Sequence, residues 1–381
     1  MPRQLPPLTG NYSVGFTDII DKQGKDKCLM RLFYPTNVQE TPQVETDYFE
    51  DTNYIQGITS FLGAPDVFAS FAKWMWSDLK LPADRDGVPT DGNFPVVVFS
   101  HGLMGNRFVY SSCCVELASQ GFVVAAVEHC DQSASATFYF DEQGEKQWVY
   151  YLEKQVLNNL CEEDQHKLRN DQLQQRSEEC SRALDCLIEI NKGAFTCLKP
   201  VIDLNNFRGK LDTSKCALLG HSFGGATMID CISKDERFKV GVAMDVWTYS
   251  LNKDFHLKLS EDVPILFINS ADYHPKYRPL GLYHVNQVMN VNAERPLVTI
   301  RGSVHQSQSD TSYYFTSSFV PRMLGLHGKT DASDITKLNN QLTVAFLRKH
   351  FGQNVELDVE EIVRKNSELL FFGSNYEALE M

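Results

Sequence analysis

Residues 216–229 read CALLGHSFGGATMI, and within them GHSFG at 220–224 matches the pattern G-x-S-x-G. A short apolar run typical of a strand precedes the pattern, and a helix-compatible stretch follows it. In this setting the pattern predicts a sharp, strained turn that lifts the hydroxyl of Ser222 above a sheet. Glycine is needed on both sides, because Cβ atoms at Gly220 and Gly224 would collide with neighbouring backbone. We therefore predict that Ser222 is a nucleophile, placed where a helix N-terminus favours developing negative charge.

Strand-like apolar runs alternate with helical segments along most of the chain. The run FPVVVFS (94–100), for example, is typical of a central strand that is buried on both faces. This alternation, together with the turn at Ser222, predicts the α/β class and the α/β-hydrolase fold, a mostly parallel central sheet flanked by helices. We expect strands at 28–34, 94–100, 122–128, 216–219, 238–244, 264–269 and 297–300, and helices at 108–120 and 335–350.

The domain organisation follows from the absence of internal repeats and of a Pro/Gly/Ser-rich linker. We expect one domain over residues 1–381. A charge-rich segment at about 141–192 interrupts the alternation. Its later part has an apolar stripe at helical spacing, so we predict a helical excursion that covers the sheet. The stripe is formed by Cys180, Leu184, Leu187 and Ile188.

Composition excludes several classes of function. Of the 381 residues 43% are hydrophobic, an ordinary fraction for a globular protein. The net charge is −13 and no basic stripe is present, so we expect no nucleic-acid partner. No apolar run is long enough for a transmembrane helix, and residues 1–7 lack the apolar core of a signal peptide. The ten cysteines form no C-x-x-C pair, so we expect free, buried thiols and no zinc or redox site. We expect a cytoplasmic protein, with secretion left open.

The loop after the expected strand at 94–100 reads HGLMG (101–105). In hydrolases of this kind, one N–H of this loop and the N–H of the residue after the nucleophile form the oxyanion hole. We therefore predict the main-chain N–H groups of Leu103 and Phe223 as its donors. His101 and His221 lie close to these positions in the sequence, and we expect both to be structural.

The catalytic base should lie late in the chain, because this fold orders its triad as Ser, then Asp or Glu, then His. His305 follows the expected strand at 297–300 and is the best candidate for taking the proton of the nucleophile. His284 and His327 are weaker candidates, since neither follows a strand directly.

Two acids compete for the remaining position of the triad. Asp245 ends the strand expected at 238–244, and Asp272 follows the strand expected at 264–269. Either could orient His305 and stabilise its protonated form. The pattern alone leaves both open and slightly favours Asp272.

Several strings are more specific than the serine pattern. Together they closely resemble the serine-dependent platelet-activating factor acetylhydrolases, a family that includes the lipoprotein-associated phospholipase A2 and an intracellular type II enzyme. The resemblance runs from about Tyr12 to Gln353. The strings are FSHGL (99–103), LASQGFVVAAVEH (117–129), SASAT (133–137), GHSFGGAT (220–227) and RGSVHQS (301–307).

The resemblance implies an answer to the choice of acid. In the family the acid ends the strand after the nucleophile helix and is closely followed by a tryptophan, as Asp245 is by Trp247. It therefore implies Asp245 as the acid, and Leu103 and Phe223 as oxyanion donors. The chain departs from the family at 104–106, where Met-Gly-Asn stands for the usual Gly-Ala-Phe. We expect this departure to alter the shape of the loop and the acyl preference.

The implied function is that of a calcium-independent, phospholipase A2-type serine esterase. It would hydrolyse the sn-2 acetyl, or the short or oxidised acyl, ester of platelet-activating factor and related phospholipids, with no cofactor. A general carboxylesterase or neutral lipase would use the same triad. A non-catalytic binding module of the same fold is a further alternative, although such modules usually lose the serine or the base.

Contact with lipid surfaces is a further expectation. Apolar residues recur at helical spacing in 54–79, and a shorter apolar patch lies at 319–326. Both segments fit core packing, but clusters of Trp and Phe also suit insertion into a membrane interface. Members of the family that this chain resembles are thought to reach phospholipid through apolar helices. We therefore hypothesise peripheral, reversible contact with lipid surfaces or lipoproteins.

Overall fold

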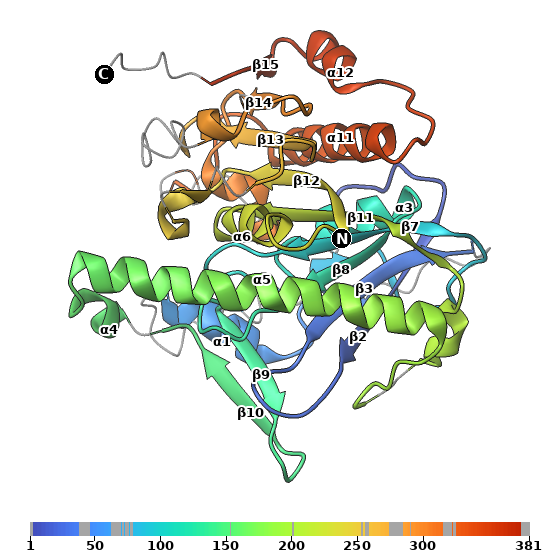
Figure 1. Cartoon of the computed structure of the whole chain (residues 1–381), viewed down its shortest axis with the longest axis vertical. Helices are drawn as coiled ribbons and strands as arrows, with labels where there is room; N and C mark the ends of the chain where they lie inside the picture. Colours follow the sequence, from blue (N-terminus) through green and yellow to red (C-terminus); the bar gives the residue numbers. More distant parts are fainter. Residues whose placement is uncertain are drawn as a thin grey trace.

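The fold is built on one large, mostly parallel sheet, seen in a computed structural model (Figure 1). Its strands lie in the order β15 (Leu370–Phe372), β14 (Leu297–Ile300), β13 (Ile265–Ser270), β12 (Phe238–Met244), β11 (Leu211–His221), β7 (Phe94–Ser100), β8 (Val123–Val127), β3 (Leu29–Thr36), β2 (Ser13–Ile20) and β6 (Asp84–Arg85). The structure describes residues 3–37, 46–61, 70, 72, 76, 79–152, 154–199, 202–252, 254–255, 259–273, 285–289, 291–314, 322 and 325–374.

The six strands from β14 to β8 are parallel to one another. Strands β3 and β15 run antiparallel to their neighbours within the sheet and extend it on either side. The predicted α/β class and mostly parallel sheet are confirmed. Two small additions lie outside it: β1 (Arg3–Gln4), β5 (Leu79–Leu81) and β4 (Thr46–Asp47) form a second sheet, and β9 (Ala136–Phe140) and β10 (Lys146–Tyr150) form a hairpin.

Side chains of the central strands alternate between two hydrophobic cores, one on each face of the sheet. In β7, Val97 and Phe99 belong to one core, and Val96 and Val98 belong to the other. The first core is closed by α1 (Thr52–Phe61), α3 (Ser111–Ser119), α11 (Ala332–His350) and α12 (Val359–Lys365). The second is closed by α5 (Glu162–Lys192) and α6 (Phe223–Ile232).

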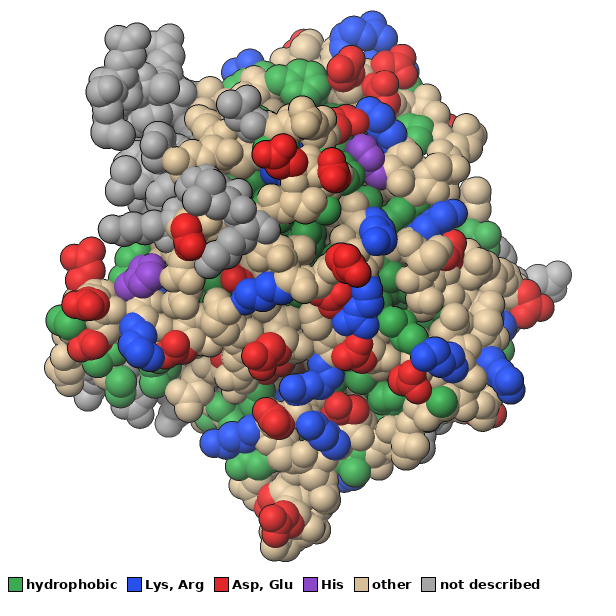
Figure 2. Space-filling view, in the orientation of Figure 1, with side chains coloured by type: hydrophobic (Ala, Val, Ile, Leu, Met, Phe, Trp, Pro, Cys, Tyr) green, Lys and Arg blue, Asp and Glu red, His purple; other side chains and the backbone are tan. Residues whose placement is uncertain are grey.

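Helix α5 runs along the second face of the sheet, where it packs on β7, β8 and β11 (Figure 1). Its first turn carries three acidic residues, which stabilise the positive end of the helix dipole. It ends at Gly193, whose φ of 73° suits the left-handed conformation of a helix C-terminus. Acidic and basic side chains are mixed on this face, without a basic patch (Figure 2).

The segment expected as a helical excursion is more varied than its charge pattern predicts. It holds strand β10 as well as α4 (Lys154–Asn158) and α5. Strand β10 is mostly exposed or half-buried, so it lacks the apolar run that marks a central strand. The predicted stripe at Cys180, Leu184 and Leu187 is buried against the sheet.

Parts of the apolar segments expected to touch lipid lie outside the described residues, namely 62–69, 71, 73–75, 77–78, 319–321 and 323–324. Those of their side chains that are described serve the core: Tyr54, Ile55, Trp76 and Leu79 are buried. None of the helices in the described part of the chain is long and apolar enough to cross a bilayer.

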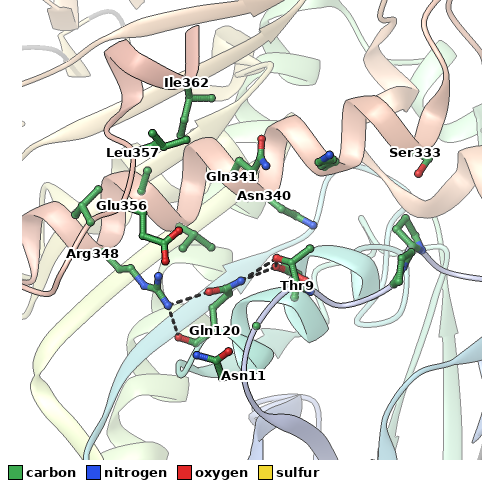
Figure 3. A pocket seen from close by; sticks show the side chains of 18 residues that line it. Thr9, Asn11, Gln120, Ser333, Asn340, Gln341, Arg348, Glu356, Leu357 and Ile362 are labelled. Atoms are coloured by element: carbon green, nitrogen blue, oxygen red, sulfur yellow. Dashed lines mark hydrogen bonds between the residues drawn. The ribbon is translucent and has the colours of Figure 1, made fainter. Parts of the chain in front are cut away.

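A pocket of about 520 Å³ lies between the N-terminal segment, α3 and α11. In Figure 3, Gln120 bridges this pocket: its amide accepts a hydrogen bond from Arg348 (2.8 Å) and donates one to Thr9 (2.9 Å). Gln120 lies three residues before the start of β8, so the pocket opens at the amino edge of the parallel strands. The predicted site residues lie at the opposite, carboxyl edge.

Candidate active site

Parallel strands bring the predicted site residues to one edge of the sheet. Strand β11 pairs with β12, and β12 with β13, so that His221 lies opposite Met244 and Met244 opposite Ile268. The residues that directly follow these strands therefore meet. In folds of this type, sites form at the carboxyl ends of the strands.

Ser222 occupies a strained turn between β11 and α6. Its φ of 57° and ψ of −115° are rare for a residue with a side chain. A Cβ atom at Gly220 would lie 2.1 Å from the carbonyl oxygen of Gly224, and one at Gly224 would lie 1.9 Å from that of Ser100. The two glycines are thus required by close backbone approach, as predicted. Two main-chain bonds hold the turn: Ser222 N donates to Met244 O (2.8 Å), and Trp247 N donates to Ser222 O (3.0 Å).

Asp245 and His305 lie side by side. Nδ1 of His305 is 3.1 Å from Oδ2 of Asp245, which is fully buried. Ser270 fixes the carboxylate further, because its N–H donates to Oδ1 (2.7 Å) and its hydroxyl to Oδ2 (2.6 Å). Asp245 also has a positive φ, 43°. Asp272, its rival in the sequence, is exposed.

The ring of His305 lies between two other rings. Tyr273 stacks on it at a centroid distance of 3.9 Å and an interplanar angle of 12°, and the His221 ring lies 4.4 Å away. His221 is buried, and its Nδ1 lies 2.8 Å from the hydroxyl of Tyr110. Burial, followed by the neighbouring His305, lowers the pKa of His221 well below its usual range. The lowered pKa disfavours protonation of His221, whose ring packs against that of His305.

The loop after β7 presents the N–H of Leu103. The carbonyl of Gly102, in the same peptide unit, contacts Nδ1 of His101 (2.8 Å) and accepts from Gly105 N (3.0 Å). Because the peptide is trans, the N–H of Leu103 points the opposite way. Phe223 is the first residue of α6, where N–H groups lack a partner within the helix. Within the described residues, neither of these N–H groups has an acceptor.

Met104 is the first of the three residues, 104–106, at which this loop departs from the family pattern. Its φ of 68° is one that glycine adopts most readily, and its N–H donates to Ser133 O (2.7 Å). Asn106 closes the loop, since its side chain accepts from Phe108 N and donates to Ser135 Oγ, both at 3.0 Å.

The other histidines considered from the sequence have structural contacts or lie elsewhere. His101 is buried, and burial, with the nearby charge of Arg176, lowers its pKa well below the usual range. Nε2 of His327 lies 2.9 Å from the carbonyl of Ser312. His284 lies outside the described residues. Among the described residues, one cluster has His, Cys, Asp or Glu side chains close enough together to hold a metal ion. It consists of His221, Asp245 and His305, which belong to the candidate site.

Comparison with known proteins identifies the family. Residues 2–368 match the family described as platelet-activating factor acetylhydrolase, isoform II. The chain belongs to this family. Platelet-activating factor acetylhydrolase of Cavia porcellus is 36% identical over 364 residues, which cover 93% of this chain and 79% of the relative. That of Canis lupus familiaris is 34% identical, covering 98% and 83%.

The fold of this acetylhydrolase family member also matches a solved esterase. The ferulic acid esterase from Streptomyces cinnamoneus superposes with a TM-score of 0.69, at 16% identity, over 98% of this chain and 99% of that one. The predicted α/β-hydrolase fold is confirmed, and the chain is a serine hydrolase.

Two residues of the site were not found by sequence reasoning. Ser270, which holds Asp245, ends β13 and carried the same positional signal that favoured Asp272. Tyr273, which stacks on His305, follows Asp272 directly. Position after a strand could have indicated both, but no chemical pattern distinguishes them from ordinary loop residues.

Proposed function

We propose that this chain is a calcium-independent esterase that hydrolyses the sn-2 acetyl, or short or oxidised acyl, ester of platelet-activating factor and related phospholipids. The observation that carries the proposal is the Asp245–His305 pair, 3.1 Å apart, beside the strained turn of Ser222 in a member of this family. Relatives named for this activity cover most of the chain.

In the proposed mechanism Ser222 is the nucleophile. Its Oγ attacks the acyl carbonyl carbon while Nε2 of His305 takes the proton, and Asp245 holds Nδ1–H and stabilises the resulting imidazolium. The N–H groups of Leu103 and Phe223 donate to the oxyanion. His305 returns its proton to the departing lysophospholipid and leaves an acetyl-enzyme. Water activated by His305 then releases acetate.

Hydrolysis of 2-acetyl and 2-palmitoyl ether phosphatidylcholine, with EDTA present, tests the proposal. We expect serine-dependent preference for the acetyl substrate, and a loss of about 10⁴-fold or more in kcat for Ser222→Ala. Ser250→Ala, a buried serine outside the triad, is the matched control. Equal turnover of both substrates would favour a general carboxylesterase or lipase, and failure to react with a fluorophosphonate would favour a non-catalytic module.

The proposal extends to the location of the enzyme. We propose a cytoplasmic protein that touches lipid surfaces reversibly. The ten cysteines, all within described residues, are free, and all but Cys161 are buried, which suits a reducing compartment. The contact is tested by flotation with neutral phosphatidylcholine vesicles, where recovery of the protein only in the dense fraction would contradict it.

A further inference from the structure

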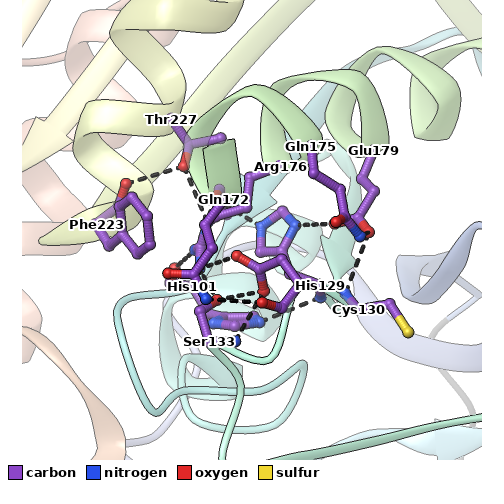
Figure 4. Close-up of polar contacts among 12 residues, drawn as sticks. His101, His129, Cys130, Ser133, Gln172, Gln175, Arg176, Glu179, Phe223 and Thr227 are labelled. Atoms are coloured by element: carbon purple, nitrogen blue, oxygen red, sulfur yellow. Dashed lines mark hydrogen bonds and ion pairs between the residues drawn. The ribbon is translucent and has the colours of Figure 1, made fainter. Parts of the chain in front are cut away.

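Arg176 is a fully buried arginine in the middle of α5, close to His101 and Phe223 (Figure 4). Its nearest carboxylate is that of Asp131, with Nη1 4.0 Å from Oδ2. A buried charge is costly unless its hydrogen bonds are satisfied. The N–H groups of the guanidinium donate to neutral acceptors rather than to a carboxylate. These acceptors lie in the loop after β7, in the segment at Ser133 that contacts this loop, and in the first turns of α6.

The first set of contacts fixes the loop that carries Leu103. Nη2 of Arg176 donates to the carbonyl oxygen of His101, two residues before Leu103. Nη1 donates to Ser133 Oγ (2.5 Å), and the carbonyl of Ser133 accepts the N–H of Met104. The loop is therefore held on both sides of Leu103 by one side chain.

The second set fixes the helix that carries Phe223. Nε of Arg176 donates to Thr227 Oγ1 (3.1 Å), which in turn donates to the carbonyl of Phe223 (2.9 Å). The guanidinium also lies over the Phe223 ring, 4.4 Å from its centroid, a cation–π contact. One side chain thus contacts the segments of both predicted donors.

A supporting network holds the same loop from behind. Nε2 of His129 lies 2.8 Å from Ser100 Oγ, and Nδ1 of His129 lies 2.6 Å from Glu179 of α5. The N–H of His129 donates to Nε2 of His101 (3.3 Å), so His101 must be neutral there. The charge of Arg176 beside it disfavours protonation, which keeps this acceptor available.

Resting on the proposed function, we propose that Arg176 is a positioning residue of the oxyanion hole, which fixes the N–H of Leu103 relative to that of Phe223. Loss of one oxyanion donor lowers kcat about 10²–10³-fold. A donor that is displaced rather than removed should cost less. We expect kcat to fall about 10–100-fold in Arg176→Gln with KM within about threefold, because substrate binding does not depend on the hole.

The test compares Arg176→Gln and Arg176→Lys with Arg169→Gln. Arg169 is a buried arginine on the same helix that bonds Gln172 and Tyr151 instead. The readouts are kcat and KM on 2-acetyl ether phosphatidylcholine, and the rate of fluorophosphonate labelling of folded protein. We expect both rates to fall together in Arg176→Gln, to recover in part in Arg176→Lys, and to stay within about threefold in Arg169→Gln.

An unchanged kcat in folded Arg176→Gln, or a rise in KM alone, would overturn the proposal. If that variant does not fold, Thr227→Val removes both hydrogen bonds that link Nε of Arg176 to the Phe223 carbonyl through Thr227 Oγ1, and it leaves the Nη contacts in place. We expect it to lower the labelling rate about 3–10-fold, and wild-type labelling would overturn the idea. Labelling does not require the lipid substrate. A wild type that labels but hydrolyses neither phospholipid contradicts the proposed function, while the labelling ratio still decides the role of Arg176.

Discussion

Asp245 accepts hydrogen bonds from both polar groups of Ser270 in addition to its contact with His305. A carboxylate held in this way fixes the orientation of the histidine, because Nδ1–H has only one acceptor direction. We expect Asp245→Asn to lower kcat about 10⁴-fold, since an amide can hold the ring in the wrong tautomer. Asp272→Asn, at an exposed position, should stay within about twofold, and a large loss there would revive Asp272 as the acid.

Asp310 makes a second residue-scale prediction, through pH. It is fully buried and accepts from the N–H and hydroxyl of Ser112 and from the hydroxyl of Tyr48. That hydroxyl has one proton and a second acceptor, Phe108 O (2.5 Å), so a protonated Asp310 would supply the missing hydrogen. Burial raises the pKa of Asp310 to about 6, from an ordinary 3.8.

The sign follows from proton binding. Between these two pKa values the folded state holds more protons than the unfolded state, so this group contributes stability at low pH that is lost as pH rises through about 6. We expect wild type to gain about 1.4 kcal/mol between pH 7.5 and pH 5 relative to Asp310→Asn. Urea unfolding of both proteins at both pH values measures the difference, and parallel pH dependence would contradict the shift.

At this scale the residues alone predict part of the candidate site. The turn at Ser222 carries its own chemical pattern, and His305 follows a strand as expected. The choice of Asp245 needed the family resemblance, because the residues alone slightly favoured Asp272. No chemical pattern marks Tyr273, because its contact with His305 depends on how two loops pack.

The elbow formed by β11 and α6 makes a prediction at the scale of elements. A methyl group at Gly224 would overlap the carbonyl oxygen of Ser100, which is fixed in the parallel sheet. We expect Gly224→Ala to lower the free energy of unfolding by more than about 3 kcal/mol, beyond the usual cost of overpacking. Denaturant unfolding checks this value.

Gly352→Ala is the matched control for this loss. Gly352 has a φ of 67° but open space around its Cα, so that alanine should cost only the strain of a left-handed residue, about 1 kcal/mol. Gly224 lies within α6 and has no positive φ, so equal losses in the two variants would mean that the overlap with Ser100 costs no more than the strain of a left-handed alanine.

Buried elements were predicted best. Strands β7, β12 and β14 have the predicted limits, because continuous apolar runs mark strands that are covered on both faces. Strand β3 extends to Thr36 with Pro35 inside it, two residues beyond the expected range of 28–34. Strand β2 and the hairpin strand β10 were missed, because neither contains a continuous apolar run. They form strands by pairing with β3 and β9, respectively, and no local sequence pattern predicts this pairing.

At the scale of the whole molecule, one sheet joins both hydrophobic cores. Because every central strand contributes side chains to each core, neither core can lose its packing without the other. We therefore expect the predicted single domain to unfold in one cooperative transition. Coincident loss of near- and far-ultraviolet circular dichroism would support this, and separate midpoints would show independent units.

The positive φ of Ser222 also has a consequence for directed evolution of thermal stability. A side chain in this conformation carries backbone strain that glycine would relieve, so the competent enzyme is less stable than an inactive version of itself. A laboratory evolution experiment that rewards heat resistance alone would therefore enrich Ser222→Gly. Directed evolution of a more stable variant of this enzyme must therefore include a screen for activity at every round.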